Sequence, residues 1–214
     1  MMSALSLRKG SIFDGYEILG EIGRGGMAII YEAQKDNQLV AIKMMHIINP
    51  TPEHIERFHR EHSILKKISH KYILNVHHEG EFQGFPYFVM ERLRGIVLSE
   101  KLKEWTKTNP SDRFQQAHSF LIQITRALKY IHNQGLVHRD IKLNNLMVLN
   151  DGSIRLMDFG VVQTPDTELT QLGAMVGTAP YISPEQIKGS EIDARSDLYA
   201  LGIVLYQMLT GKHP

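Results

Sequence analysis

A short polar segment, residues 137–148 (VHRDIKLNNLMV), holds six hydrogen-bonding side chains within eight consecutive positions. These are His138, Arg139, Asp140, Lys142, Asn144 and Asn145. An aspartate in a loop can orient a hydroxyl group and accept its proton, and a nearby lysine can balance charge on a transferring phosphoryl group. The segment follows a helical pattern and precedes strand-like ones, so we expect a loop that is fixed by buried elements on both sides.

A second set of oxygen donors lies close by in the sequence. Asp158 stands within Leu156-Met157-Asp158-Phe159-Gly160, shortly after the amide of Asn145. Carboxylate and amide oxygens suit Mg²⁺, a hard cation that bridges phosphate groups. Each residue alone would more often be a turn former, and only together do they indicate phosphate chemistry.

Two charged residues in the first half of the chain are predicted to lie on the apolar faces of their elements. Strand alternation in LVAIKMM places Lys43 on the same face as Ala41 and Met45, and Glu61 falls inside the apolar stripe of a predicted helix. A carboxylate that faces a core requires a cationic partner. Lys43 can be that partner, although either residue alone would by default extend to water.

The run Ile22-Gly23-Arg24-Gly25-Gly26-Met27-Ala28 joins two strand-like segments. Glycines in such a place let backbone N–H groups close over a phosphate without Cβ obstruction. A hairpin that only needs positive φ explains the same run equally well.

The elements that must position these residues change in character along the chain. Strands are predicted at 16–22, 28–33, 39–45, 74–80 and 85–92, with a turn at Gly84 and a helix that begins at Thr51-Pro52. Further helices are predicted from a Ser99 cap to about 107, from about 112 to 133 with a stop at Gly135, and over 197–209. The sequence therefore predicts an α+β protein with a change of lobe near Arg94-Gly95.

Composition narrows the function classes. The chain has 214 residues, 43% apolar content and a net charge of +1, which is sufficient for a core and gives no sign of nucleic-acid binding. There are no cysteines, no apolar leader in the first residues and no apolar run of the roughly 20 residues that a membrane span requires. We expect a cytoplasmic domain without a membrane segment. His59, His62, His77 and His78 are better explained as solvated or half-buried side chains than as metal ligands.

The ordered motifs resemble the protein kinase superfamily, and among kinases they are most similar to the eukaryotic-like Ser/Thr kinases of bacteria. The motifs are the glycine run, Val40-Ala41-Ile42-Lys43, His138-Arg139-Asp140 with Asn145, and Asp158-Phe159-Gly160, within a match from about Tyr16 to Pro214. The resemblance implies a bilobal fold. Residues 1–15 would be an extension, 16–94 an N-lobe with a small antiparallel sheet and one helix, and 95–214 a partial, mainly helical C-lobe that stops after its central helix.

The resemblance also implies roles for individual residues. The catalytic set would be Asp140 as base, Lys142 at the γ-phosphate and Asn145, with Asn145 and Asp158 binding Mg²⁺. The ATP site would comprise Ile22, Gly23, Gly25, Gly26, Ile30, Ala41, Lys43, Glu61, Glu91 and Leu93, with Met90 as gatekeeper. Asp197 would reach the catalytic-loop backbone. The implied activity is signal-transducing phosphoryl transfer from ATP to Ser or Thr hydroxyls of proteins.

Control of such an enzyme would involve the segment after Asp158. We expect autophosphorylation at Thr167 or Thr170 with Arg139 as partner, whereas Thr178 would have a structural role. Ala28 replaces the third glycine of the loop and Ser183 replaces the alanine of Ala-Pro-Glu. Glu185 would pair with an arginine that the chain does not reach, and a partial C-lobe would expose an apolar patch and self-associate.

Two other classes remain open from the sequence. A pseudokinase-like scaffold would bind nucleotide without transferring phosphate, but it would need none of Lys43, Asp140, Asn145 and Asp158. A small-molecule kinase is disfavoured by the segment 178–185, which in the family receives a peptide.

Overall fold

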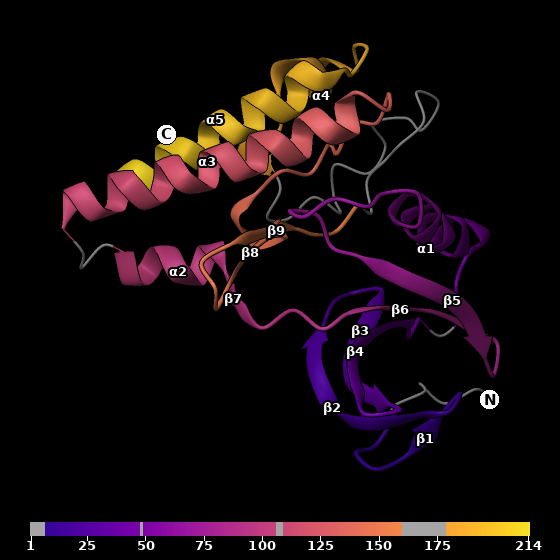
Figure 1. Cartoon of the computed structure of the whole chain (residues 1–214). Helices are drawn as coiled ribbons and strands as arrows, with labels where there is room; N and C mark the ends of the chain where they lie inside the picture. The colour runs from indigo at the N-terminus through magenta and orange to yellow at the C-terminus, as the bar shows by residue number, and fades with distance from the viewer. Residues whose placement is uncertain (1–6, 48, 106–108, 160–178) are drawn as a thin grey trace. The chain divides into compact units, whose positions relative to one another are not determined.

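The computed structural model describes residues 7–47, 49–105, 109–159 and 179–214. The chain divides into two compact units (Figure 1). The N-terminal unit comprises Met1–Ser69 and Leu74–Leu93, and the C-terminal unit comprises His70–Ile73 and Arg94–Pro214. The predicted α+β class is confirmed, since the first unit is built on a sheet and the second mainly on helices.

The N-terminal unit contains a curled six-stranded antiparallel sheet in the order β1-β2-β3-β4-β6-β5 (Figure 1). Its strands are β1 (Ile12–Phe13), β2 (Tyr16–Arg24), β3 (Ala28–Lys35), β4 (Gln38–Met45), β5 (Val76–Phe82) and β6 (Phe85–Glu91). Strand β6 lies inside the sheet, and all but its last residue is buried. A strand covered on both faces is expected to be a nearly continuous apolar run, as FPYFVME is.

Two tight turns fix the register of this sheet. Asp36 and Asn37 have φ of 49° and 62° between β3 and β4, and Gln83 and Gly84 have φ of 52° and 82° between β5 and β6. Positive φ at both central residues gives a two-residue turn whose twist matches that of the flanking strands. The predicted turn at Gly84 is confirmed.

One face of the sheet forms the core of the N-terminal unit. Alternate residues of β3, β4 and β6 belong to one buried apolar cluster, which includes Tyr31, Ile42, Met44, Tyr87 and Val89. Side chains alternate between the faces of a strand, so Ile30, Ala41, Lys43, Phe88 and Met90 belong to the opposite face. The functional candidates of this unit therefore gather on the face away from its main core.

Helix α1 (Pro52–Leu65) begins where the sequence predicts. The Thr51 hydroxyl accepts from the His54 N–H, and the His54 ring accepts from the Thr51 N–H, so the first turn is capped in both directions. Phe58 packs on Phe88 of β6 with ring centroids 5.2 Å apart. The helix thus covers the sheet face that carries Lys43.

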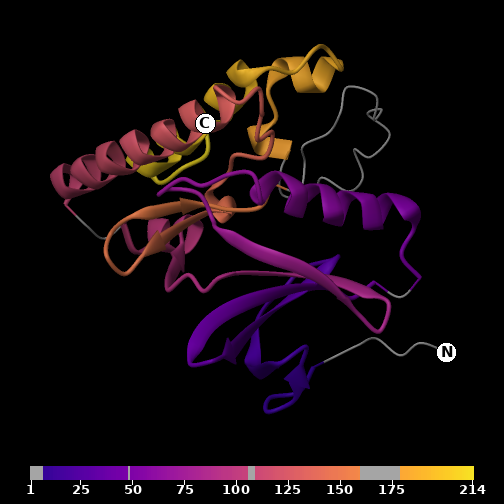
Figure 2. The same ribbon diagram turned by 45° about the vertical axis from the view of Figure 1, so that its right-hand side comes forward.

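The C-terminal unit is organised around α3 (Pro110–His132) and α5 (Ala194–Thr210), which run side by side (Figure 2). Helix α2 (Leu98–Trp105) packs through Trp105, whose ring stacks on Phe120 of α3 at 5.6 Å. A small sheet of β7 (Gly95–Val97), β8 (Leu146–Leu149) and β9 (Ile154–Leu156) follows the order β7-β8-β9. A short helix, α4 (Pro184–Lys188), precedes α5.

Several observed boundaries differ from the predicted ones by one to three residues. Helix α2 begins at Leu98, one residue before the predicted Ser99 cap, because the buried Leu98 already belongs to its packed face. Helix α3 begins at Pro110 because Asn109 caps it, accepting from the Ser111 N–H at 3.0 Å. Helix α5 begins three residues early because Asp193 caps it. Strand β5 occupies 76–82 instead of 74–80, and β1 was not predicted.

Helix α5 exposes an apolar stripe. Leu198, Tyr199, Tyr206 and Leu209 are 51%, 45%, 45% and 38% exposed, and their spacing places them on one side of the helix. The predicted exposed patch is therefore present. Self-association through it stays a prediction, which a stable monomer in size-exclusion chromatography at high concentration would contradict. Among the described helices, none has the length and apolarity of a membrane span.

Candidate active site

Lys43 and Glu61 form a buried ion pair in the N-terminal unit. Lys43 Nζ lies 2.6 Å from Glu61 Oε1, and the two side chains are 16% and 8% exposed. Lys43 comes from β4 and Glu61 from α1, so the contact joins the helix to the sheet. The pairing that the sequence predicts is confirmed, and its reason is that neither charge could be buried alone.

The other nucleotide-site candidates of this unit surround that pair. Ile30 is the direct antiparallel partner of both Lys43 and Gly23, and Ala41 is that of Met90. Directly opposed residues share a face of the sheet, so all five lie on one surface. Ile22 is 42% exposed at the end of β2. An apolar face with one buried cation is a suitable surface for a ring system that carries phosphates.

The glycine run forms the connection between β2 and β3. The Gly25 N–H donates to the Ala28 carbonyl at 2.9 Å, and His46 Nε2 lies 2.9 Å from the Gly25 carbonyl. Gly23, Gly25 and Gly26 are absent from the residues with positive φ. A Cβ added at Gly26 would meet nothing within 4 Å. The alternative that these glycines serve only a positive-φ turn is therefore wrong, and the backbone at Gly26 has open space beside it.

Of the candidate hinge residues, Glu91 is the last residue of β6 and Leu93 follows the strand. The Glu91 N–H donates to the Asn75 carbonyl at 3.0 Å, and Glu91 Oε1 accepts from the Asn75 N–H at 2.9 Å. These bonds fix Glu91 against the segment that leads into β5. Leu93 is buried, and its carbonyl accepts from the Arg92 guanidinium.

Asp140, Lys142 and Asn145 come together in the C-terminal unit. Asp140 Oδ2 lies 2.8 Å from Lys142 Nζ and accepts from Asn145 Nδ2 at 2.8 Å. Asn145 Nδ2 also donates to the Asp140 carbonyl. The second carboxylate oxygen, Oδ1, is buried and has no hydrogen-bond partner among the described residues. An orphaned carboxylate oxygen is expensive to keep and suits an incoming hydroxyl donor.

Asp158 is placed next to this group by the backbone. The Met157 N–H donates to the Asn145 carbonyl at 2.9 Å, and Asp158 follows with φ of 53°. Phe159 is buried, with its ring edge-to-face on His138 at 4.6 Å. The amide nitrogen of Asn145 donates to Asp140, so the amide oxygen of Asn145 can face a cation. This oxygen and the Asp158 carboxylate are the hard donors that Mg²⁺ prefers, so the residues present fit that ion.

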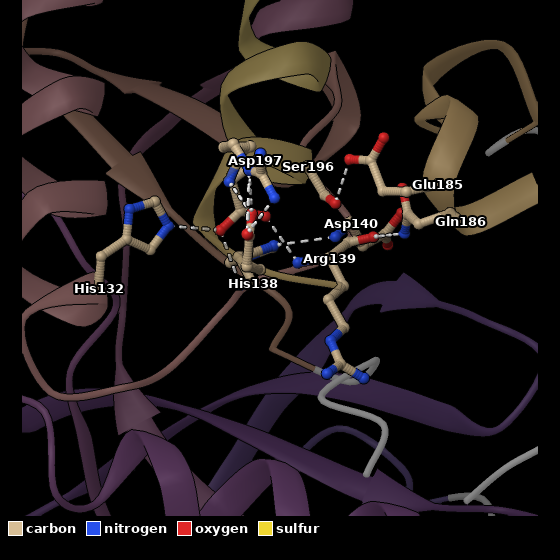
Figure 3. Close-up of polar contacts among 10 residues, drawn as sticks. His132, His138, Arg139, Asp140, Glu185, Gln186, Ser196 and Asp197 are labelled. Carbon is tan, nitrogen blue, oxygen red and sulfur yellow. Dashed lines mark hydrogen bonds and ion pairs between the residues drawn. The ribbon is translucent and has the colours of Figure 1, made fainter. Parts of the chain in front are cut away.

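Asp197 fixes the backbone of the candidate catalytic loop, as the resemblance implies. Its carboxylate accepts from the His138 N–H at 2.9 Å and the Arg139 N–H at 2.8 Å (Figure 3). Sequence reasoning missed a third contact, in which His132 Nε2 lies 2.7 Å from Asp197 Oδ2. Asp197 is in the first turn of α5 and His132 ends α3. Nothing in the sequence pairs these helix ends.

Glu185 of α4 is bonded to the first turn of α5. Ser196 Oγ donates to Glu185 Oε1 at 2.5 Å. This hydrogen bond lowers the pKa of Glu185. The arginine partner that the resemblance implies for Glu185 stays an expectation. Ser183 caps α4 at its N-terminus, so the change from alanine supplies a capping residue.

The expected regulatory residues are Arg139 and the threonines of the segment after Asp158. The Arg139 side chain points away from the hydrogen bonds of its own backbone (Figure 3), and burial lowers its pKa while Asp197 opposes that shift. Gly160, Thr167, Thr170 and Thr178 lie outside the described residues.

Two histidines of the N-terminal unit share one acidic neighbour. His59 Nδ1 and His62 Nδ1 lie 3.4 Å and 2.8 Å from the same Glu79 oxygen. Within the described residues, no group of three or more His, Cys, Asp or Glu side chains could hold a metal ion.

Comparisons with known proteins agree with this arrangement. Residues 16–214 match the family model described as protein kinase domain. The chain is 39% identical over 213 residues to a probable serine/threonine-protein kinase PknB of Corynebacterium glutamicum, covering 95% of this chain and 32% of that protein. The corresponding values for the PknB of Lactococcus lactis are 37% identity, 96% of this chain and 33% of that protein. The chain thus spans about a third of the length of these relatives.

Solved structures show the same relationship at the level of the fold. The PknI kinase domain of Mycobacterium tuberculosis matches with a TM-score of 0.74 and 26% identity, covering 98% of this chain and 79% of that one. The predicted kinase fold, with a curled antiparallel sheet in the N-lobe and a helical C-lobe, is confirmed. The family match covers most of the sequence, and this chain therefore belongs to the protein kinase domain family.

Proposed function

We propose that this domain is a Ser/Thr protein kinase that transfers the γ-phosphoryl group of ATP to Ser or Thr hydroxyls of proteins. The names of its relatives support this substrate class. We also propose that residues 16–94 form the N-lobe of this kinase and residues 95–214 belong to its C-lobe. We further propose that Thr167 or Thr170 is autophosphorylated and that the phosphate pairs with Arg139.

The observation that carries the proposal is the state of the Asp140 carboxylate. One oxygen is held by Lys142 and Asn145, and the other is buried without a hydrogen-bond partner in the described part of the chain. A carboxylate held through one oxygen can accept a hydroxyl proton with the other. Its rotation is limited by Asn145, which donates to both the side chain and the main chain of Asp140.

The remaining residues receive complementary roles. Lys43, held by Glu61, would contact the α- and β-phosphates, and the backbone at Gly23, Gly25 and Gly26 would cover the phosphates. Ile22, Ile30 and Ala41 would contact the adenine ring, which Glu91 and Leu93 would bind through their backbone.

Lys142, released from Asp140 toward the γ-phosphate, would balance the charge that moves with the phosphoryl group. Asn145 and Asp158 would hold Mg²⁺, which neutralises phosphate charge when bound. Asp140 would orient the acceptor hydroxyl in line with the phosphoryl group and take its proton.

Phosphate transfer from radiolabelled ATP with Mg²⁺ tests the proposal. The acceptors are the protein itself and a generic basic protein, and the variants are Asp140→Asn and the matched control Asp151→Asn, which changes an exposed aspartate of the β8–β9 turn. We expect Asp140→Asn to reduce transfer about a hundredfold or more and Asp151→Asn to leave it unchanged. An Asp140→Asn variant with wild-type transfer contradicts the proposal.

If the wild-type protein transfers no phosphate, its melting temperature provides a second measurement. If ATP and Mg²⁺ still raise its melting temperature, the nucleotide site forms without catalysis, which is the behaviour of a nucleotide-binding scaffold. The Lys43→Met variant should abolish that shift, because it removes the buried cation of the candidate phosphate site.

A further inference from the structure

The side chain of Gln186 contacts two different parts of the C-terminal unit. Its Oε1 accepts from the Ser183 N–H at 2.9 Å and from Ser183 Oγ at 3.0 Å, and its Nε2 donates to the Arg139 carbonyl at 3.3 Å (Figure 3). The two donors on Ser183 fix which end of the amide is oxygen, because the reverse orientation would set oxygen against the Arg139 carbonyl. The amide therefore links α4 to the catalytic loop.

The bonded carbonyl belongs to a residue in an unfavourable conformation. Arg139 has φ of 65°, and non-glycine residues adopt this left-handed region at a cost of about 1 kcal/mol. Such a conformation persists only where the surroundings determine it. Asp197 holds the N–H of Arg139 and Gln186 holds its carbonyl, so both peptide groups that flank this residue are anchored.

The peptide group that Gln186 anchors is the one that leads into Asp140. The Arg139 carbonyl and the Asp140 N–H belong to the same planar unit, and that N–H donates to His138 Nδ1 at 3.3 Å. With both ends held, the plane cannot rotate, and the direction in which the Asp140 side chain leaves the backbone is fixed.

Helix α4 is itself attached at a second point. Ser196 Oγ donates to Glu185 Oε1, and Ser196 directly precedes Asp197. Neighbouring residues of α4 thus bond to neighbouring parts of one network: Glu185 to the first turn of α5 and Gln186 to the catalytic loop.

We infer that Gln186 is a positioning residue for Asp140, through which α4 sets the geometry of the catalytic loop. The inference rests on the proposed function for its effect on catalysis, but the contacts that carry it are independent of ATP. The competing explanation is that Gln186 only caps α4.

Two substitutions separate these explanations. Gln186→Glu keeps an acceptor for the Ser183 N–H, and glutamate is a preferred residue at this position of a capping box. It removes the donor to Arg139 and sets a carboxylate oxygen against the carbonyl. Ser183→Ala is the matched control, because it removes the hydroxyl contribution to the cap and leaves the Gln186–Arg139 bond in place.

The experiment measures kcat, the KM for ATP, and backbone hydrogen exchange over residues 138–145 for the wild type and both variants. We expect Gln186→Glu to lower kcat about tenfold, to leave the KM for ATP unchanged and to increase exchange in the loop. Ser183→Ala should leave kcat and loop exchange close to the wild type. A Gln186→Lys variant, which retains a donor and loses the acceptor, should keep more of kcat than Gln186→Glu.

Two results overturn the inference. One is wild-type kcat and loop exchange in Gln186→Glu, and the other is an equal loss in Ser183→Ala, which would assign the effect to the cap. If the wild type transfers no phosphate, the proposed function fails, and loop exchange that rises in Gln186→Glu but not in Ser183→Ala still supports the positioning role.

Discussion

His132 Nε2 lies 2.7 Å from Asp197 Oδ2, so the last residue of α3 meets the first turn of α5. A carboxylate is favourable at a helix N-terminus, since its negative charge opposes the positive partial charge there. The same carboxylate holds the backbone of His138 and Arg139. The contact therefore holds the Asp197 carboxylate that fixes the backbone of the candidate catalytic loop.

Substitutions at this contact should have unequal effects. Asp197→Asn sets an amide N–H against a group that is itself a donor, so we expect a loss of about 3 kcal/mol in the free energy of unfolding. His132→Phe removes one of three donors and should cost about 1 kcal/mol. Urea denaturation measures both, and equal losses would show that the loop bonds do not depend on the Asp197 charge.

Substitutions of the Lys43–Glu61 pair should have non-additive effects on the free energy of unfolding. Lys43→Met leaves a carboxylate that is 8% exposed without its cation, and we expect a loss of about 3 kcal/mol. The double variant Lys43→Met with Glu61→Leu should recover most of that loss, because no buried charge remains. Urea denaturation of the four proteins in the cycle gives the coupling energy, and simple additivity contradicts a buried, interdependent pair. ATP affinity, under the proposed function, should stay lost in the double variant.

A substitution at Gly26 distinguishes the role of the glycine run in folding from its role in ATP binding. A Cβ there meets nothing within 4 Å, and Gly26 is not among the residues with positive φ. Gly26→Ala should leave the stability unchanged or raise it by about 0.5 kcal/mol. If phosphates lie against this backbone, the same change should weaken ATP binding about tenfold by calorimetry. Gly152→Ala is a contrasting control, because φ of 78° there predicts lower stability and unchanged ATP affinity.

His62 predicts an acid-sensitive N-terminal unit. Burial of its ring lowers its pKa, and Glu79 opposes the shift from 2.8 Å away. The folded state therefore binds a proton less readily than the unfolded state, so stability falls as the pH drops below the ordinary histidine value of 6.5. His62→Leu should flatten the pH dependence of the denaturation midpoint between neutral pH and pH 5, whatever its effect at neutral pH. The exposed His77→Gln is the control, and an unchanged slope in His62→Leu assigns the acid sensitivity elsewhere.

Sequence reasoning succeeded where the signal was local. Thr51-Pro52 predicts the start of α1, and strand and helix periods predict that Lys43 and Glu61 each face inward, because capping and side-chain period depend on nearby residues. The motif order predicts the fold, since few other folds require these residues in this order.

The missed features depend on contacts across long stretches of sequence. His132 and Asp197 are 65 positions apart, and Gln186 and Arg139 are 47 apart. No periodicity carries such information, because the pairing exists only after the helices pack. The two-residue strand β1 is also beyond sequence patterns, since it is too short to show a period and depends on pairing with β2 and on packing of Phe13 against Phe82 and Tyr87.

Arg139 and Asp158 have φ of 65° and 53°, a conformation in which glycine would be more stable than either residue. A search for thermostable variants should therefore favour glycine at both positions, gaining about 1 kcal/mol at each. Those same changes remove the guanidinium proposed to pair with a phosphate and the carboxylate proposed to bind magnesium. Laboratory selection for heat resistance alone should thus drive this domain toward well-folded but inactive proteins.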